Sequence, residues 1–360
     1  MCFKLENVKV LHIGEVAGLG GLQNWVCSVA EAQAKRGYEV ELMQPPWIDP
    51  ASRVYTALPV HRWNLEQVRN FDIVHSHGLG GYENRKIRKI ALKPIVHSYY
   101  GTILGIQIAL RWFQNLAGWN GLTVPRNIVR DAMCGHAACS VIAISPKVRS
   151  EIRRFYGIQN GRVTVIPGGY SRDGDGASRA SLRKALGLPE FGFLFLFVGR
   201  ADPVKNFPAA SAAFRRIRAR FHDAHLVVAP KQDSYVGDEA VGVELPPQRM
   251  NALYRCVDAL VHPGFYEGYS LAVHEALANG LPVIVGRNTG IADYCTHLTD
   301  ALILPPKRGS GLVESLADMM GSLIESQHLR TTLGAEAARK FAVMDWDRVA
   351  AETENVYSSL

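Results

Sequence analysis

Residues 262–286 read HPGFYEGYSLAVHEALANGLPVIVG, and the fold class follows from the order of elements in this segment. Just before it, residues 258–262 are apolar and partly β-branched, which predicts a short buried strand closed by a Pro-Gly pair. A glycine-containing loop follows at 267–270, and the pattern over 271–278 is helical. A glycine and a proline end this helix, and 282–285 begins a second strand. We therefore predict a βαβ unit of an α/β protein.

Two carboxylates of this unit, Glu267 and Glu275, stand eight residues apart. At about 100° per residue, eight helical residues make two full turns and about 80° more. Glu275 therefore lies about 80° round the helix axis from a residue eight positions earlier on the same helix. Both can therefore face one crevice at the carboxyl edge of a parallel sheet, where open α/β folds bind ligands. The amides of Gly268, Tyr269 and Ser270 lie at the positive end of the helix and can hold a phosphate. Because carboxylates repel phosphate, they must face neutral hydroxyls, as a nucleotide-sugar would provide.

The composition is that of a globular enzyme, and the length suits two domains of ordinary size. The 360 residues are 48% hydrophobic and 20% charged. The net charge of +7 suits an anionic ligand but does not distinguish a nucleotide from a nucleic acid or a lipid headgroup. No nucleic-acid-binding motif is recognisable, so we expect no nucleic-acid partner.

Cysteine usage and the N-terminus predict a cytoplasmic protein. None of the six cysteines forms a CxxC pair, which is typical of reduced, buried thiols. The N-terminus has no apolar segment typical of a secretion signal. No apolar run approaches the roughly 20 residues that span a bilayer.

The first half opens with an apolar strand at 8–14, a loop containing Gly18, Gly20 and Gly21, and a helix over 22–36. Its spacing is not GxGxxG, so the dinucleotide fingerprint is absent. The loop either makes a tight turn only or also exposes backbone amides to a ligand.

Histidines stand near the ends of two further predicted strands, 71–75 and 95–98. His75 and His77 could bind a metal, but no third ligand stands at helical spacing nearby, so we predict no metal site. His97 lies near a strand end beside the expected crevice, and a structural histidine is the alternative interpretation. The aromatic-rich segment 99–131 is either core or a wall for a sugar ring or an apolar acceptor.

The second half repeats the α/β alternation after a linker rich in Gly, Ser and Asp at 168–178. A strand buried on both faces is predicted at 193–198, followed directly by Gly199 and Arg200. Arg200 and Lys205 then occupy the strand end and the next loop, where cations can hold a diphosphate. Two solvated surface cations are the alternative.

Three basic clusters, at 85–93, 147–154 and 215–220, are most simply solvated helix faces. The first two could also contact an anionic membrane surface, which would make the protein peripheral at the inner face of the membrane.

Together these features closely resemble the retaining glycosyltransferases of the GT-B fold in glycosyltransferase family 4, over nearly the whole chain. The segment EGYSL…EALANGLPVI, which begins at Glu267, matches the family signature EGFGL…EAMAxGxPVV. Gly199-Arg200 with Lys205, and the pair Gly20-Gly21, add to the resemblance. Two departures stand out: PGG at 167–169 replaces PNG, and TGIAD at 289–293 replaces GGxPE.

The resemblance implies two Rossmann-like, doubly wound domains facing a central cleft. Residues 1–168 would form the N-terminal, acceptor-side domain, and 169–344 the C-terminal domain that binds the nucleotide-sugar donor. The last helix, 345–360, would pack back on the first domain.

The resemblance also implies roles for residues of the donor domain. Arg200 and Lys205 would neutralise the donor diphosphate, Glu267 would hold hydroxyls of the transferred sugar, and Glu275 would hold those of the ribose. The amides from Gly268 through Tyr269 and Ser270 to Leu271 would help to bind sugar and phosphate.

On the acceptor side, His97 would match the family's active-site histidine, close to the donor sugar. Gly20 and Gly21 would approach the phosphates or the acceptor.

The resulting prediction is a retaining, metal-independent glycosyltransferase with no tightly bound cofactor. The donor would be a UDP- or GDP-sugar, and the acceptor hydroxyl would belong to an oligosaccharide, a glycolipid or a glycosylated natural product. The alternatives are a nucleotide-sugar epimerase, a phosphorylase-like enzyme of the same fold, and a non-catalytic two-lobed sugar-binding protein.

Overall fold

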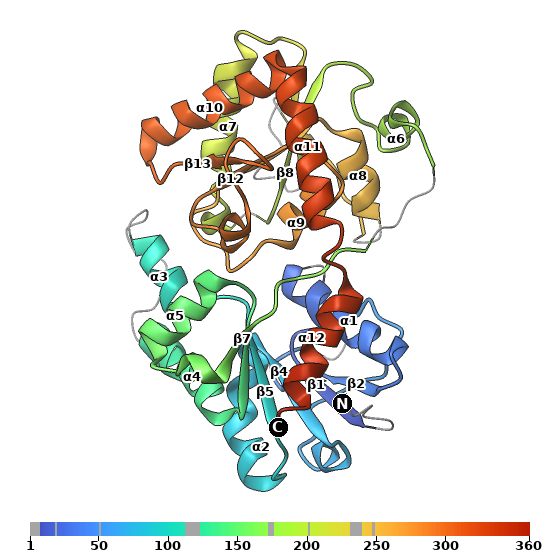
Figure 1. Cartoon of the computed structure of the whole chain (residues 1–360), viewed down its shortest axis with the longest axis vertical. Helices are drawn as coiled ribbons and strands as arrows, with labels where there is room; N and C mark the ends of the chain where they lie inside the picture. Colours follow the sequence, from blue (N-terminus) through green and yellow to red (C-terminus); the bar gives the residue numbers. More distant parts are fainter. Residues whose placement is uncertain are drawn as a thin grey trace. The chain divides into compact units, whose positions relative to one another are not determined.

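The chain divides into two units in the computed structural model (Figure 1). The first unit is Met1–Gly169 with Asp345–Leu360, and the second unit is Tyr170–Met344. The structure describes residues 8–18, 20–49, 52–111, 123–171, 176–200, 202–230, 240–246 and 249–360.

The first unit is built on a seven-stranded parallel sheet with the order β3-β2-β1-β4-β5-β6-β7. Its strands are β1 (Lys9–Ile13), β2 (Glu39–Met43), β3 (Val60–His61), β4 (Ile73–His77), β5 (Ile95–Tyr99), β6 (Ser140–Ala143) and β7 (Val163–Val165). The α-helices are α1 (Gly21–Lys35), α2 (Asn84–Ile90), α3 (Ile103–Arg111), α4 (Thr123–Ala137), α5 (Pro146–Tyr156) and α12 (Trp346–Tyr357). Short 3₁₀ turns are η1 (Gln67–Asn70), η2 (Gly78–Glu83) and η3 (Asn160–Arg162).

Local signals in the sequence set the ends of these helices. At α5, the Ser145 hydroxyl accepts from the amide of Val148 at 3.2 Å, Pro146 occupies the first turn, and Gly157 ends the helix with φ +69°. This is the usual combination of a serine cap, an N-terminal proline and a C-terminal glycine.

The C-terminal helix α12 belongs to the first unit, where it lies against α1 (Figure 1). Asp345 caps it by accepting from the amide of Arg348 at 2.8 Å. On the α1 side, the guanidinium of Arg36 donates to Glu354 at 2.7 Å and to Asp347 at 3.0 Å. The chain therefore returns to its first unit after completing the second.

The second unit has a six-stranded parallel sheet with the order β10-β9-β8-β11-β12-β13. Its strands are β8 (Phe193–Val198), β9 (Ala224–Ala229), β10 (Ala240–Gly242), β11 (Ala259–His262), β12 (Val283–Gly286) and β13 (Leu302–Leu304). The α-helices are α6 (Arg179–Ala185), α7 (Phe207–Arg218), α8 (Met250–Cys256), α9 (Leu271–Ala278), α10 (Gly309–Glu325) and α11 (Gln327–Phe341), with 3₁₀ turns η4 (Pro203–Lys205) and η6 (Gly290–Tyr294).

Apolar strands give the second unit its core. Phe195 and Phe197 of β8 are fully buried and pack with Phe214 of α7 and Leu316 of α10. The predicted α/β class and the two Rossmann-like sheets are thus confirmed. In each sheet the first strand of the unit, β1 or β8, lies in the interior, and later strands are added on both sides of it, as in doubly wound folds.

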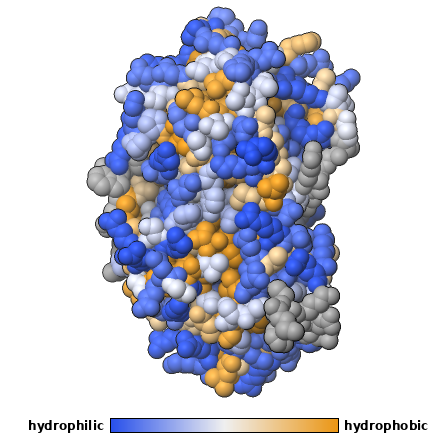
Figure 2. Space-filling view, in the orientation of Figure 1, coloured by the Kyte–Doolittle hydropathy of each residue, from blue (hydrophilic) through white to orange (hydrophobic). Residues whose placement is uncertain are grey.

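No helix among the described residues is long and apolar enough to cross a membrane. The face drawn in Figure 2 is mainly hydrophilic over both units. The Asp173–Asp175 part of the predicted linker and the centre of the aromatic-rich segment 99–131 lie outside the described residues.

Candidate active site at the carboxyl edge of the second sheet

The strands β8 and β11 are parallel neighbours, with Leu196 opposite Leu260. They therefore end at the same edge of the sheet, and the loops that follow them meet there. These loops bring together two residues that the sequence predicted, because Nζ of Lys205 donates to Oε1 of Glu267 at 2.6 Å. Sixty-two positions separate the two residues in the chain.

A second basic residue, His262, contacts the other oxygen of the same carboxylate. Its Nε2 lies 2.7 Å from Oε2 of Glu267, although not at a hydrogen-bonding angle, and its side chain is only 1% exposed. Burial alone would raise the pKa of Glu267, but the charges of Lys205 and His262 outweigh burial and hold this pKa far below its usual range. Glu267 is therefore ionised at neutral pH and can only accept hydrogen bonds.

The turn after Glu267 is strained and tied to the loop after β12. Ser270, immediately before α9, has φ +91°, which is unusual for a residue with a side chain. The amide of Gly290 donates to the carbonyl of Glu267 at 2.9 Å, and that of Ile291 to the carbonyl of Tyr269 at 3.1 Å. These bonds hold the turn in its strained form.

Two buried hydroxyls near this turn, those of Ser270 and Thr289, have no hydrogen-bond partner among the described residues. Buried polar groups normally have partners, so these two are open to bond with a ligand. Ser270 stands at the N-terminus of α9, where partial positive charge favours an anion, and Thr289 pairs with Glu267 through an isolated β-bridge.

Glu275 lies on the second turn of α9 in a different environment. Its Oε2 accepts from the hydroxyl of Tyr254 at 2.8 Å. Burial raises the pKa of Glu275 to about 7, and the bond from Tyr254 only partly opposes this. Its carboxyl group therefore changes protonation near neutral pH, whereas Glu267 stays charged.

Arg200 follows β8 in the loop that carries Lys205, and it is exposed. The preceding Gly199 packs closely on the lysine, because a Cβ added there would lie 3.2 Å from Cγ of Lys205. The backbone at Gly199 thus packs against the aliphatic part of the Lys205 side chain.

The remaining predicted site residues lie in the first unit. Gly20 precedes α1 and Gly21 begins it, at the carboxyl edge of β1. No described residue lies within 4 Å of a Cβ added at Gly21, so a ligand can approach the backbone there.

His97 lies inside the first unit and is fully buried. Its Nδ1 is 2.9 Å from the hydroxyl of Ser76, its ring packs edge-on against Tyr99, and burial lowers its pKa to about 3. A Cβ added at Gly81 would lie 2.4 Å from its Cε1. Its other ring nitrogen, Nε2, is buried and has no hydrogen-bond partner among the described residues, so a role for His97 at the active site stays a prediction.

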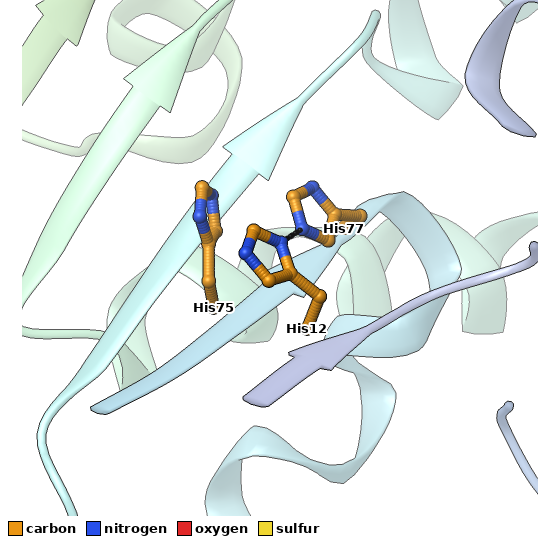
Figure 3. A group of neighbouring side chains, drawn as sticks. All are labelled: His12, His75 and His77. Carbon is orange, nitrogen blue, oxygen red and sulfur yellow. Dashed lines mark hydrogen bonds between the residues drawn. The ribbon is translucent and has the colours of Figure 1, made fainter. Parts of the chain in front are cut away.

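A group of three histidines at the centre of the first sheet was not predicted. His12 of β1 lies beside His75 and His77 of β4, and their potential ligand atoms fall within 4.8 Å of one another (Figure 3). His12 is the third potential ligand that spacing along the sequence could not reveal.

The hydrogen bonds of this group do not favour a metal. His12 bonds His77 and Gln33, each at 2.8 Å, and His77 also bonds the Tyr100 hydroxyl at 2.8 Å. His75 bonds the hydroxyls of Tyr357 at 2.7 Å and Ser98 at 2.8 Å. All six ring nitrogens thus have protein partners.

The rings of His75 and His77 also contact each other, with centroids 4.1 Å apart and planes tilted by 31°. We describe these residues, with their partners, as the histidine network.

Burial is the main cause of low pKa values in the histidine network. It lowers the pKa of His12 to about 4, and those of His75 and His77 well below 6.5, with neighbouring histidines adding to the effect. The Gln33 oxygen can only accept, so His12 donates to it. A neutral ring has one donor and one acceptor nitrogen, so His12 accepts from His77, and His77 accepts from the hydroxyl of Tyr100.

Two family models match consecutive parts of the chain. "Glycosyltransferase Family 4" matches residues 19–173, and "Glycosyl transferases group 1" matches residues 178–340. The second match contains the Lys205–Glu267 pair and α9.

Related sequences are similar over most of their lengths. An uncharacterized glycosyltransferase of Methanocaldococcus jannaschii is 22% identical, with 94% of each chain covered. A D-inositol 3-phosphate glycosyltransferase of Kineococcus radiotolerans is 25% identical over 94% of this chain and 90% of its own length.

Solved structures share the fold. Sucrose-phosphate synthase of Thermosynechococcus elongatus has a TM-score of 0.79 at 19% identity, covering 98% of this chain and 99% of its own. The Anabaena protein HepE, in complex with UDP and glucose, also has a TM-score of 0.79, at 15% identity, covering 98% of this chain and all of its own. With both halves matched in order, the chain belongs to the family 4 glycosyltransferases and has their two-domain GT-B fold.

Proposed function

We propose that this glycosyltransferase takes its sugar from a nucleoside-diphosphate sugar and transfers it to a hydroxyl acceptor with retention of the anomeric configuration. The observation that carries the proposal is the Lys205–Glu267 contact beside the strained turn at Ser270. It places a cation, an ionised carboxylate and a helix N-terminus at one sheet edge.

These groups suit the parts of a nucleotide-sugar. Lys205, with Arg200 in the same loop, would neutralise the diphosphate. Glu267, as a pure acceptor, would take hydrogen bonds from hydroxyls of the transferred sugar. Glu275 would hold the ribose hydroxyls, and the amides of Gly268 to Leu271 would bind sugar and phosphate.

The ion pair has a role in this scheme. Lys205 holds Glu267 in place, so little reorganisation is needed when phosphate oxygens approach the ammonium group. The carboxylate can then accept sugar hydroxyls while it keeps its partner His262.

The reaction would proceed on one face of the sugar. The bond between sugar and phosphate lengthens to an oxocarbenium-like state while the acceptor hydroxyl enters from the same side. The leaving phosphate takes the proton of that hydroxyl, so the configuration is retained. Side-chain cations and the helix end would stabilise the departing diphosphate without a metal ion.

UDP-glucose is the first donor to test, because structural neighbours of the chain include HepE in complex with UDP-glucose. The curated relatives named D-inositol 3-phosphate glycosyltransferase make a phosphorylated polyol the first acceptor to test.

The experiment measures sugar transfer by the purified chain with UDP- and GDP-sugars, with and without EDTA, and reads the product's anomeric configuration by NMR. We expect an unchanged anomeric configuration and full activity in EDTA. Lys205→Ala should lower turnover by about 10²–10³-fold, as for loss of a group that stabilises the transition state. Lys184→Ala, at an exposed lysine of the same unit, is the matched control.

Three results would contradict the proposal: inversion, complete loss of activity in EDTA, or normal turnover in Lys205→Ala. Release of an altered nucleotide-sugar without any acceptor would indicate an epimerase instead.

A further inference from the structure

The first unit contains a cavity of about 390 Å³ that none of the predicted site residues line. Small-molecule sites commonly measure about 300–1,000 Å³, so this volume suits a single ring-sized ligand. The cavity opens where β2 and β3 end. These strands are parallel, with Met43 opposite His61. The lining consists of β3 itself, residues that follow the two strands, and Val54.

One polar group in the lining needs a partner. Gln44 directly follows β2 and is 7% exposed, and its Oε1 has no hydrogen-bond partner in the part of the chain that the structure describes. An amide oxygen left unpaired in this way costs stability unless a donor reaches it. A ligand hydroxyl would be such a donor.

The rest of the lining divides into an apolar wall and a cation. Pro45, Ile48 and the half-buried Trp63 offer apolar and aromatic surface, on which the apolar face of a sugar-like ring can pack. Arg62 lies next to Trp63, is exposed, and makes no ion pair with any described residue.

The described residues that line the cavity include no Asp or Glu, and Arg62 is their one Arg or Lys. The nearby carboxylate of Glu41 has a partner, because its Oε2 lies 2.5 Å from Nε2 of His61. The charge of the lining therefore favours an anion, in a chain with a net charge of +7.

We propose that this cavity binds the acceptor, and that the acceptor is a ring-shaped polyol carrying an anionic group. A ring hydroxyl would donate to Gln44, the ring would pack on Trp63, and the anionic group would pair with Arg62. This assignment rests on the proposed function, since it names the substrate that receives the sugar.

The test is calorimetric titration of the full chain with glucose 6-phosphate, glucuronate, uncharged glucose and inorganic phosphate. We expect at least one anionic sugar to bind about tenfold more tightly than glucose and than inorganic phosphate, since both ring and charge contribute. The two anionic sugars distinguish a phosphate from a carboxylate.

Three variants assign the contacts. Arg62→Gln should weaken the anionic sugar about 5–10-fold and leave glucose unchanged, as expected for loss of one charge-assisted contact. Arg69→Gln, an exposed arginine of the same unit away from the cavity, should change neither. Gln44→Met should weaken both sugars, with folding checked by circular dichroism.

Binding of inorganic phosphate as tight as that of the sugars, equal effects of Arg62→Gln and Arg69→Gln, or no binding of any sugar would overturn the assignment. UDP binding, measured in the same variants, should stay unchanged. If the wild-type chain binds no nucleotide-sugar, the proposed function fails. The sugar titrations then still test, independently, whether the cavity binds an anionic ring-shaped polyol.

Discussion

At the residue scale, Glu267 and Glu275 are two carboxylates of one βαβ unit with opposite behaviour. Glu267 contacts Lys205 and His262, and these charges lower its pKa despite burial. Among the described residues, the partner of the Glu275 carboxyl group is the neutral hydroxyl of Tyr254, so burial dominates and its pKa rises to about 7. Environment rather than residue type decides which one stays charged.

The raised pKa of Glu275 predicts a pH-dependent penalty. Since the folded state holds the proton more tightly than the unfolded state, this group's contribution to stability is full below pH 4.5 and is lost as pH rises through about 7. Glu275→Gln keeps an acceptor for Tyr254 and removes the charge. At pH 8 it should therefore raise the free energy of unfolding of the second unit by about 1–3 kcal/mol relative to wild type.

Urea unfolding at pH 5, 6.5 and 8 measures this effect. The advantage of the variant should shrink steadily towards pH 5. A difference independent of pH would show that the Glu275 carboxyl group titrates normally in the folded protein.

At the element scale, α12 is held to the first unit by polar contacts at both ends. Arg36, directly after α1, pairs with Asp347 and Glu354, and Tyr357 bonds His75 of the first sheet. The surface pairs contribute little, but the buried bond would leave an unpaired imidazole nitrogen if it were broken. Tyr357 therefore matters more than the ion pairs.

Tyr357→Phe tests this contact. Removing one hydroxyl should cost about 1–3 kcal/mol through the unpaired Nδ1 of His75, and it should speed hydrogen exchange in α12 more than elsewhere. Tyr55→Phe, whose hydroxyl makes no described hydrogen bond, is the control. Equal exchange rates in α12 of wild type and Tyr357→Phe would exclude a role for this bond in holding the helix.

At the scale of the whole molecule, the two units share a doubly wound parallel architecture, but the side chains at the centre of their sheets differ. The second sheet is centred on the phenylalanines of β8, whereas the first has polar side chains at the centre of β4 and β5. The histidine network gives each ring nitrogen of His12, His75 and His77 a partner, and its bonds run in one direction only while the rings are neutral.

The first unit should therefore be sensitive to mild acid. The folded pKa values of its buried histidines lie below the unfolded value of about 6.5, so the unfolded state binds more protons. Stability is fully present above pH 6.5 and is lost as pH falls towards about 4, by about 1.4 kcal/mol per pH unit for each histidine. Asp131, whose pKa burial raises to about 6, opposes this only in part.

Hydrogen exchange at pH 7, 6 and 5, corrected for the intrinsic rates, measures the effect unit by unit. We expect protection of β1, β4 and β5 to fall before that of β8 and β11. His12→Gln removes one titrating ring and should reduce the pH dependence, whereas His328→Gln, at an exposed position of α11, should leave it unchanged. Simultaneous loss of protection in both units would contradict the prediction.

The sequence by itself determined the α/β class, the βαβ unit around Glu267 and the family. Apolar periodicity, glycine and proline stops, and the EGYSL…EALANG signature are local features that need no knowledge of distant contacts. The two-residue strand β3 was missed because Val60–His61 is too short to show a period, and only pairing with β2 defines it.

Only the tertiary structure decided which side chains meet. It brought Lys205 and His262 to Glu267, placed His97 in the interior, and gathered His12, His75 and His77 from two strands with Tyr357 from the last helix. The physical reason is that parallel strands far apart in the chain lie side by side, so their neighbours depend on strand order. Burial, which shifts the pKa values of the buried histidines and glutamates, likewise depends on tertiary packing and cannot be inferred from a local sequence pattern.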